Sequence, residues 1–402
     1  MGSEGAGKGF APERFGSTHQ VMLDRATPLI EAGLWYRPSY FPILGEKTWR
    51  QSCDREVLAV RNHVGVCDVS TLGKIDIKGP DSSKLLDFVY INNFSNLQVQ
   101  RVRYGLMLRE DGFVMDDGTT ARLSDTHYLM TTTTAAASQV MCHLDFVHQC
   151  LHPEWDVSFN SVTEHWTQFA IAGPKASNLL NDLLDTPLLE RDWPFMKCAS
   201  VEVFGVDCRL FRISFSGELG YELAVPSRYG ESLFRILISK AEELGGSAYG
   251  MEALNVLRIE KGFITHAEID GRVTAFDLGM ERLMSAKKDF IGKTASQRPG
   301  LVDPKRPRLV GLKPVGSVKK LTAGSHLFNE KDPSQANYCR GYVSSVAYSP
   351  NLERFHGLAF LEEGIESYGQ IIRMVDHVRG IEAICEVTSA IAFDPQGERT
   401  RA

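Results

Sequence analysis

The chain has 402 residues, 43% of them hydrophobic, and a formal net charge of −6 at pH 7. A chain of this length exceeds the size at which one hydrophobic core stops growing, so we expect two or three packed units. The composition is that of an ordinary globular protein, and it lacks the basic stripe of a nucleic-acid-binding surface. No signal-peptide pattern and no segment of bilayer-spanning length is present, which favours a cytoplasmic protein without a membrane association.

Residues 1–12 are rich in glycine and charge and are expected to form a flexible tail. Hydrophobic periodicity then predicts a first α+β module in residues 13–160. Its expected helices cover 55–64, 80–89 and 137–151, and its expected extended segments cover 65–68, 73–77, 103–108, 113–115, 119–123 and 128–134.

A similar succession predicts a second α+β module in residues 161–298. Its expected strands are 167–171, 199–204, 208–213 and 222–225, and its expected helices are 174–183, 229–244 and 251–262. The proline-rich stretch 299–314 indicates a boundary. Short apolar runs separated by Gly, Pro and Asn then predict a small β barrel or sandwich in 299–402. The expected fold class is therefore α+β with a C-terminal β domain.

Sequence patterns for common cofactors and metals are weak. The segment GSEGAGKG has Gly9 where a phosphate loop needs Ser or Thr, and no GxGxxG follows a predicted strand. His148 and His152 have the spacing of two ligands on one helix face, but no third and fourth ligands are indicated. Packing between domains is the favoured interpretation of these histidines, and no metal is expected. The eight cysteines lack a CxxC pair and are expected to be free thiols.

Two adjacent carboxylates, Asp116 and Asp117, end the run YGLMLREDGFVMDDG. Side chains alternate between the faces of a strand, and burying an unpaired carboxylate is costly. We therefore expect one of the two carboxylates to face a pocket. The alternative is that Asp-Asp-Gly forms an ordinary hairpin turn.

A second group of carboxylates lies in the segment FSGELGYE, where Gly217 and Gly220 flank Glu218 and an aromatic residue precedes Glu222. By itself the segment is typical of a hairpin with solvated glutamates. The alternative is a functional role, in which Glu222 binds a ligand. One carboxylate can accept hydrogen bonds from the two adjacent donors on the edge of a pterin ring, while aromatic side chains cover the faces of the ring.

Four motifs occur in an order and spacing that resemble the folate-dependent aminomethyltransferase family, to which the glycine cleavage T protein belongs. They are DVS at 68–70, the run at 104–117, the segment at 216–222 and LRIEKG at 257–262. Longer runs such as STLGKIDIKGPD, RISFSGELGYE and KKDFIGK are very similar to the C-terminal half of the α subunit of heterotetrameric sarcosine oxidase. The resemblance implies a cloverleaf of three domains around a central tetrahydrofolate cavity.

The resemblance also implies roles for single residues. Asp117 matches the catalytic aspartate of the family, and Asp116 is then expected to be its partner in the turn. The implied cofactor-binding residues are Leu72, Tyr104, Thr133, Phe195, Phe215 and Glu222, with Glu222 as the pterin-binding carboxylate, and Tyr348 is expected on the substrate side. Thr133 replaces the usual asparagine. Residues 253–255 are Ala-Leu-Asn where the T protein has Ala-Arg-Asp, so the substrate of the T protein is not assumed.

The function that this resemblance implies is one-carbon transfer to tetrahydrofolate. Because the chain carries no dinucleotide-binding fingerprint, a separate flavoprotein is expected to oxidise an N-methyl amine such as sarcosine. This chain would then trap the oxidised carbon as 5,10-methylenetetrahydrofolate. One alternative is a free-standing demethylase that moves an intact methyl group from a sulfonium, ammonium or aryl ether donor. Another is a folate-binding module without catalysis, which the presence of both Asp117 and Glu222 disfavours.

Overall fold

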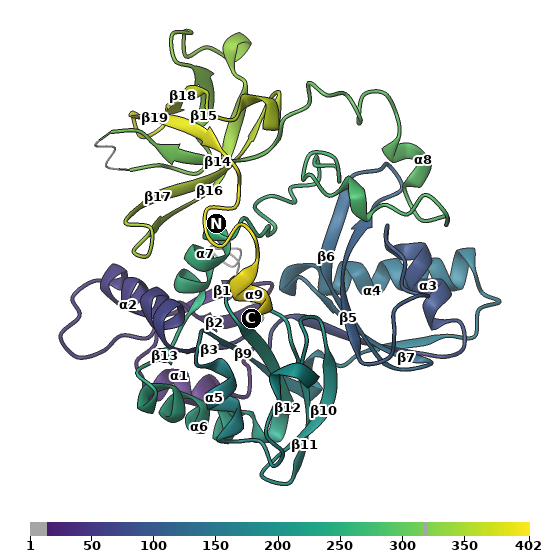
Figure 1. Cartoon of the computed structure of the whole chain (residues 1–402). Coiled ribbons are helices and arrows are strands. Elements are labelled where there is room, and N and C mark those ends of the chain that lie inside the picture. Colours follow the sequence, from purple (N-terminus) through teal and green to yellow (C-terminus); the bar gives the residue numbers. More distant parts are fainter. Residues whose placement is uncertain (1–13, 317–319) are drawn as a thin grey trace, which may run out of the picture.

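The structure is a computed structural model that describes residues 14–316 and 320–402. The tail expected at 1–12 lies outside the described residues. Three main sheets organise the described part of the chain, one five-stranded, one six-stranded and one closed into a six-stranded barrel (Figure 1). The expected α+β class and the C-terminal β barrel are therefore confirmed. Among the described helices, none has both the length and the hydrophobicity that crossing a membrane requires.

The first sheet has the strand order β5-β6-β7-β4-β8. Its strands are β4 (Gly73–Lys78), β5 (Arg101–Leu108), β6 (Val114–Ser124), β7 (His127–Thr132) and β8 (Ser158–Ser161). The helices α3 (Ser82–Val89) and α4 (Ala137–Phe146) pack on one face, with a π-helical turn at Val147–Leu151. Ile75 and Ile77 of β4 belong to this core. Because strand side chains alternate, Lys74 and Asp76 point to the opposite face of the sheet.

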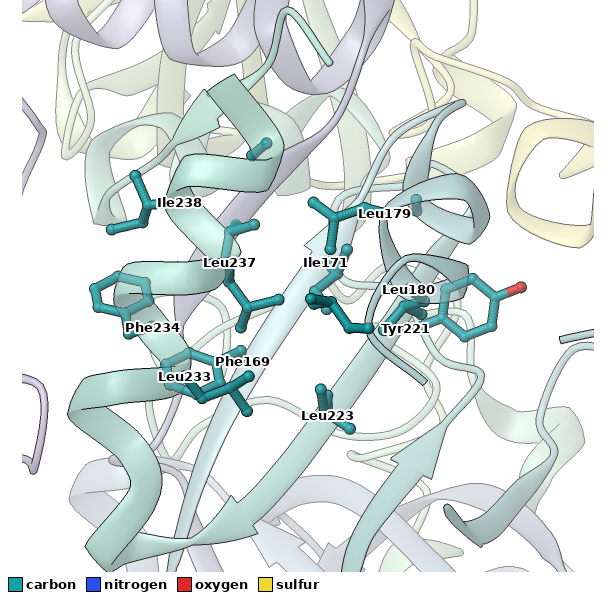
Figure 2. Packing of buried hydrophobic residues seen from close by; sticks show 14 of the residues in the cluster. Phe169, Ile171, Leu179, Leu180, Tyr221, Leu223, Leu233, Phe234, Leu237 and Ile238 are labelled. Carbon is teal, nitrogen blue, oxygen red and sulfur yellow. The ribbon is translucent and has the colours of Figure 1, made fainter. Parts of the chain in front are cut away.

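The second sheet has the order β10-β11-β12-β9-β3-β13. Its strands are β3 (Gly65–Asp68), β9 (Trp166–Ala172), β10 (Cys198–Val203), β11 (Val206–Phe211), β12 (Gly220–Pro226) and β13 (Ser247–Ala248). The helices α1 (His19–Asp24), α5 (Ala176–Asn181) and α6 (Gly230–Glu243) cover one face. Figure 2 shows Phe169 of β9 and Leu223 of β12 directed toward the apolar face of α6, which carries Phe234 and Leu237.

Strand β3 comes from the segment that was expected to form the first module, yet it lies inside the second sheet. It pairs antiparallel with β9 and parallel with β13. Residues 13–160 therefore contribute strands to both sheets. The domain limits at 160 and 298 stay predictions, because strand pairing alone does not define a domain.

Helix α2 (Trp49–Asn62) begins six residues before its expected start at 55. The cause is a capping box, in which the Thr48 side chain accepts from the Gln51 backbone and the Gln51 side chain accepts from the Thr48 backbone. The hairpin of β1 (Leu29–Ala32) and β2 (Trp35–Pro38) was not predicted.

The barrel closes because β14 pairs with both β17 and β19. Its strands are β14 (Arg308–Pro314), β15 (His326–Asn329), β16 (Gly341–Ser349), β17 (Arg354–Leu361), β18 (Ile371–Asp376) and β19 (Ile381–Thr388). Helix α7 (Met251–Glu260) packs against β16 and joins the barrel to the second sheet. The short helices α8 (Lys293–Ser296) and α9 (Glu398–Arg401) lie on either side of the barrel in the chain.

The first and second sheets meet through the faces that their helices leave uncovered. A separate apolar cluster joins strands β5, β6 and β7 of the first sheet to β10, β11, β12 and the loop after β11 of the second sheet. It contains Val102, Ala121, Leu129, Cys198, Phe211, Ile213 and Ala224. Side chains on these two inner faces therefore lie between the sheets. This space holds the polar groups that matter for the site.

Candidate active site

Asp116 and Asp117 lie in the middle of strand β6, and the expectation of a turn at Asp-Asp-Gly is wrong. Across the hairpin Asp117 is paired with Leu106 and Asp116 with Met107. The chain reverses earlier, where the Arg109 amide donates to the Phe113 carbonyl at 2.8 Å. Asp116 is therefore not a turn partner, because the ladder between β5 and β6 continues through it.

The two carboxylates point to opposite faces of the sheet, as the alternation of side chains requires. Asp116 is 3% exposed, and its Oδ2 accepts a hydrogen bond from the Thr133 amide at 3.2 Å. Asp117 is half-buried, and its Oδ2 accepts from the Tyr104 hydroxyl at 2.8 Å. The structure thus brings Asp117 together with Tyr104 on one face of the sheet, whereas Asp116 contacts the Thr133 backbone on the other face.

Burial raises the pKa values of both carboxyls. Burial and then the charge of Asp116 raise the pKa of Asp117 to about 7, while the hydrogen bond from Tyr104 acts in the opposite direction. Burial raises the pKa of Asp116 to about 6, against hydrogen bonds from Thr133. An acid with a pKa near neutrality exchanges its proton readily at physiological pH.

The segment between α7 and α8 covers the Tyr104–Asp117 pair. The Met280 sulfur lies 3.8 Å from the Tyr104 hydroxyl. In the same segment, Glu268 forms a fully buried ion pair with Arg258 of α7 at 2.9 Å and accepts a hydrogen bond from Ser345 of the barrel at 2.6 Å. Glu268 also contributes to the raised pKa of Asp117. Helix α7 and the barrel therefore hold in place the segment that covers Asp117.

Glu222 lies on the inner face of the second sheet. Its neighbours Tyr221 and Leu223 belong to the core on the helix side (Figure 2). Because strand side chains alternate, Glu222 points to the opposite face, toward the first sheet. It is 8% exposed and accepts a hydrogen bond from Nε2 of Gln168 on β9. Burial raises the pKa of Glu222 to about 7, against this hydrogen bond and the charge of Lys74. Beside it, the buried Oε1 of Gln168 has no hydrogen-bond partner.

A narrow gap of about 10 Å³ separates the sheets next to this carboxylate. It is lined by Thr119, Ala121, Leu129, Thr131, Gln168, Phe211 and Ile213. Thr119 lies two residues from Asp117 on the same face of β6, so the gap lies between the strand of the aspartate and the acceptor pair at Glu222. A gap of this size holds about one water, so a ring-sized ligand has to displace side chains that line it.

The predicted aromatic and apolar lining is distributed around this region. Phe215 is 37% exposed and stacks on Phe263, with ring centroids 5.7 Å apart. Leu72 is half-buried and packs against the core around α7. Phe195 is half-buried, and its carbonyl accepts a hydrogen bond from Arg101 at 3.1 Å. Their roles as cofactor-binding residues stay predictions.

Tyr348 lies on β16 beside helix α2. The Arg50 guanidinium stacks over its ring at 4.6 Å, and Phe355 meets the ring edge to face at 5.4 Å. Among the contacts of the described residues, none joins Tyr348 to Asp117 or Glu222. A substrate-side role for Tyr348 therefore stays a prediction.

Glu218 is a buried ion-pairing residue and not the solvated glutamate of an ordinary hairpin. It is 1% exposed and pairs with Arg61 at 3.0 Å and with Arg399 at 2.9 Å. Arg61 also pairs with Glu260 of α7 at 2.6 Å. This network anchors the loop before β12 to α2, α7 and α9, and so fixes the strand that carries Glu222.

The sequence analysis did not identify Gln168 or Lys74 as site residues. A weak signal was present, because each is a polar residue within a strand-like segment that also carries apolar residues. The two histidines with ligand-like spacing have packing partners instead. His152 stacks on Trp155 at 3.8 Å, and the His148 ring contacts the Trp155 carbonyl at 3.1 Å.

Comparison with known proteins finds one matching family and several similar enzymes. The family described as the GCVT N-terminal domain matches residues 18–288. The sarcosine oxidase subunit alpha of Rhizobium meliloti is 45% identical over 396 residues, covering 98% of this chain and 40% of that protein. The aminomethyltransferase of Thermus thermophilus is 31% identical over 374 residues, covering 92% of this chain and 99% of that protein.

The same fold occurs in a solved structure. The glycine cleavage system aminomethyltransferase T from Bartonella henselae matches with a TM-score of 0.81 at 20% identity, covering 95% of this chain and 98% of that one. By contrast, the chain spans about 40% of the length of the sarcosine oxidase subunits that it matches.

Proposed function

Because this chain belongs to the GCVT aminomethyltransferase family, we propose that it is an enzyme that transfers a one-carbon unit to tetrahydrofolate. The observation that carries the proposal is a pair of desolvated carboxyls, Asp117 and Glu222, on the facing surfaces of two stacked sheets. Structural carboxylates are normally neutralised by a cation. Among the described residues, neither of these two forms an ion pair.

Tetrahydrofolate fits the donor and acceptor groups at Glu222. The Glu222 carboxylate and the unpartnered Gln168 Oε1 are neighbouring acceptors in a buried place. The edge of a pterin ring offers an N–H and an amino group side by side, which match two such acceptors. Buried hydrogen bonds to an ionised group are the strong ones, so this pair would fix the orientation of the ring. We propose that Leu72, Tyr104, Thr133, Phe195 and Phe215 line the rest of the cofactor site.

When bound, tetrahydrofolate supplies the nucleophilic nitrogens that accept the one-carbon unit. Asp117 is the proposed catalytic residue, which takes up or returns a proton at the reacting centre. Its pKa of about 7 suits both directions of transfer, and the Tyr104 hydroxyl fixes the orientation of the carboxylate. A general acid–base group held in this way contributes roughly 10²- to 10⁴-fold to a rate. The segment around Met280 covers part of the pair and so reduces its contact with water.

For the donor we propose an oxidised N-methyl amine such as sarcosine, produced on a flavoprotein partner, with 5,10-methylenetetrahydrofolate as the product. The support is the 45% identity to a sarcosine oxidase subunit alpha over nearly the whole of this chain.

A labelled-carbon experiment tests the function. The chain is incubated with tetrahydrofolate, methyl-¹³C sarcosine, a flavoprotein that oxidises sarcosine and an enzyme that scavenges free formaldehyde. We expect ¹³C in 5,10-methylenetetrahydrofolate above the level in a mixture without the chain. Label in 5-methyltetrahydrofolate would instead support an intact-methyl demethylase, and no label in folate would contradict the proposal.

Two variants assign the roles of the carboxyls. Asp117→Asn is expected to bind folate and to lose transfer, whereas Asp125→Asn, at an exposed turn of the same sheet, is expected to behave like wild type. Glu222→Gln is expected to weaken folate binding about 10- to 100-fold, since a hydrogen bond to a charged group contributes about 1.5–3 kcal/mol. The matched control is Glu202→Gln on the exposed surface of β10.

A further inference from the structure

Lys74 is a buried cation on the inner face of the first sheet. It pairs across strands with Thr131, which lines the gap between the sheets, and it is 0% exposed. Taking an ammonium group out of water is costly unless partners compensate. Among the described residues, no carboxylate lies within ion-pair distance of it. Its Nζ donates instead to the carbonyls of Ser70 and Leu72, at 2.7 and 3.1 Å.

These two carbonyls belong to the turn that connects β3 to β4, and this turn holds Gln168. The Ser70 hydroxyl accepts from the Gln168 amide at 3.0 Å, and the Val69 amide donates to the Gln168 carbonyl at 2.9 Å. The side chain of Gln168 then donates to Glu222. A continuous set of hydrogen bonds therefore runs from the Lys74 ammonium through the turn to the Glu222 carboxylate.

The charge of Lys74 acts on the same carboxylate. Burial raises the pKa of Glu222 to about 7, and Lys74 opposes this rise. Burial lowers the pKa of Lys74 to about 8, against the charges of Asp68 and Glu222. The other titratable groups near Glu222 are Cys67 and Tyr249, and burial raises the pKa values of both far above neutrality. Among the described residues, Lys74 is thus the cation that acts on Glu222 at pH 7.

We propose that Lys74 is a positioning residue of the folate site, whose buried ammonium favours the ionised form of Glu222 near neutral pH and holds the turn that aligns Gln168. The inference rests on the proposed function, since it concerns a ligand that Glu222 binds. An ionised Glu222 accepts two hydrogen bonds from a donor edge, whereas a protonated carboxyl presents a donor of its own to that edge. Folate affinity should therefore depend on pH through Glu222, and Lys74 should set the pH at which it changes.

The test measures dissociation constants of the air-stable probe 5-formyltetrahydrofolate between about pH 6 and pH 9. This range covers the titrations of Glu222 and Lys74. For wild type we expect binding to weaken below about pH 7, the pKa of Glu222. For Lys74→Met the midpoint should move up by about one pH unit. This lowers the ionised fraction of Glu222 at pH 7 from about one half to about one tenth, so binding should be about fivefold weaker at pH 7 and recover toward wild type at pH 9. Lys74→Arg, which keeps the charge, should restore most of the affinity at pH 7.

Lys78→Met is the matched control, because Lys78 lies on the same strand with an exposed side chain. Glu222→Gln should remove the pH dependence, and if it does not, the assignment to Glu222 is wrong. Equal weakening of Lys74→Met at every pH would mean a packing role and would overturn the inference. If Lys74→Met does not fold, Lys74→Gln makes the same comparison. Wild type that fails to bind the probe would contradict the proposed function itself, a result distinct from the other outcomes.

Discussion

Replacing Tyr104 by Phe removes one hydroxyl group from the site and leaves the ring in place. That hydroxyl donates to Asp117 Oδ2 at 2.8 Å. Burial and the charge of Asp117 raise the pKa of Tyr104 well above its ordinary value, so the hydroxyl is a permanent donor at neutral pH. Because it stabilises the ionised aspartate, its loss should raise the pKa of Asp117.

The size of the shift follows from the strength of the bond. A hydrogen bond to a charged group contributes about 1.5–3 kcal/mol, and about 1.4 kcal/mol corresponds to one pKa unit. Since Asp117 is half-buried, we expect the lower end of this range. The pKa of Asp117 should therefore rise from about 7 to about 8 in Tyr104→Phe.

The assay is ¹³C NMR of protein labelled at the aspartate carboxyl carbon, with Asp117→Asn to assign the signal. Asp116→Asn should move the same titration in the opposite direction, because the charge of Asp116 raises the pKa of Asp117. Tyr338→Phe, at an exposed tyrosine, should leave the titration unchanged. A midpoint in Tyr104→Phe that stays in place or falls would refute the reasoning.

Three further predictions concern stability, each measured by urea unfolding. Gly118→Ala should destabilise the fold by more than about 2 kcal/mol, because its Cβ would lie 2.0 Å from the Thr131 carbonyl oxygen, whereas Gly300→Ala, with open space around it, should be nearly neutral. Arg61→Met should cost about 3–5 kcal/mol, since the buried Glu260 loses its cation and the buried Glu218 keeps only Arg399. A destabilisation below about 1 kcal/mol would contradict the buried network. In wild type the raised pKa of Asp116 should cost stability as the pH rises from about 4 to about 6. Asp116→Asn should therefore match wild type near pH 4 and exceed it by up to about 3 kcal/mol above pH 6, and a constant difference at all pH values would contradict this account.

The sequence predicted the alternation of the two aspartates correctly and placed the turn wrongly, for a physical reason. Two Asp-Gly steps occur close together, at 111–112 and 117–118, and both suit a hairpin turn. The structure uses the first, where Gly112 has φ +90°. Gly118 is required for a different reason, since strands β6 and β7 approach too closely there for a side chain. Local sequence does not distinguish a glycine needed for its backbone angle from one needed for its missing Cβ.

The features that the sequence did not predict depend on partners far along the chain. The local sequence around Glu218 is typical of a solvated glutamate. The residues that pair with it, Arg61 and Arg399, are 157 and 181 residues away in the sequence. Lys74 and Gln168 acquire a role through the stacking of two sheets, which no local pattern specifies. The carboxylates themselves stood out in the local sequence, and the resemblance to the family assigned their expected roles. The family relationship is confirmed.

The position of strand β3 between β9 and β13 constrains the order in which the chain can fold during synthesis. Residues 73–161 form the first sheet from nearly contiguous sequence, so that sheet can assemble while the rest is still being made. Strand β3 can pair only after β9 and then β13 have been synthesised. The whole first sheet lies in the sequence between the end of β3 and its first partner, β9. Its unpaired edges are exposed to other nascent chains throughout this interval, which makes 65–68 the segment where misassembly is expected to start.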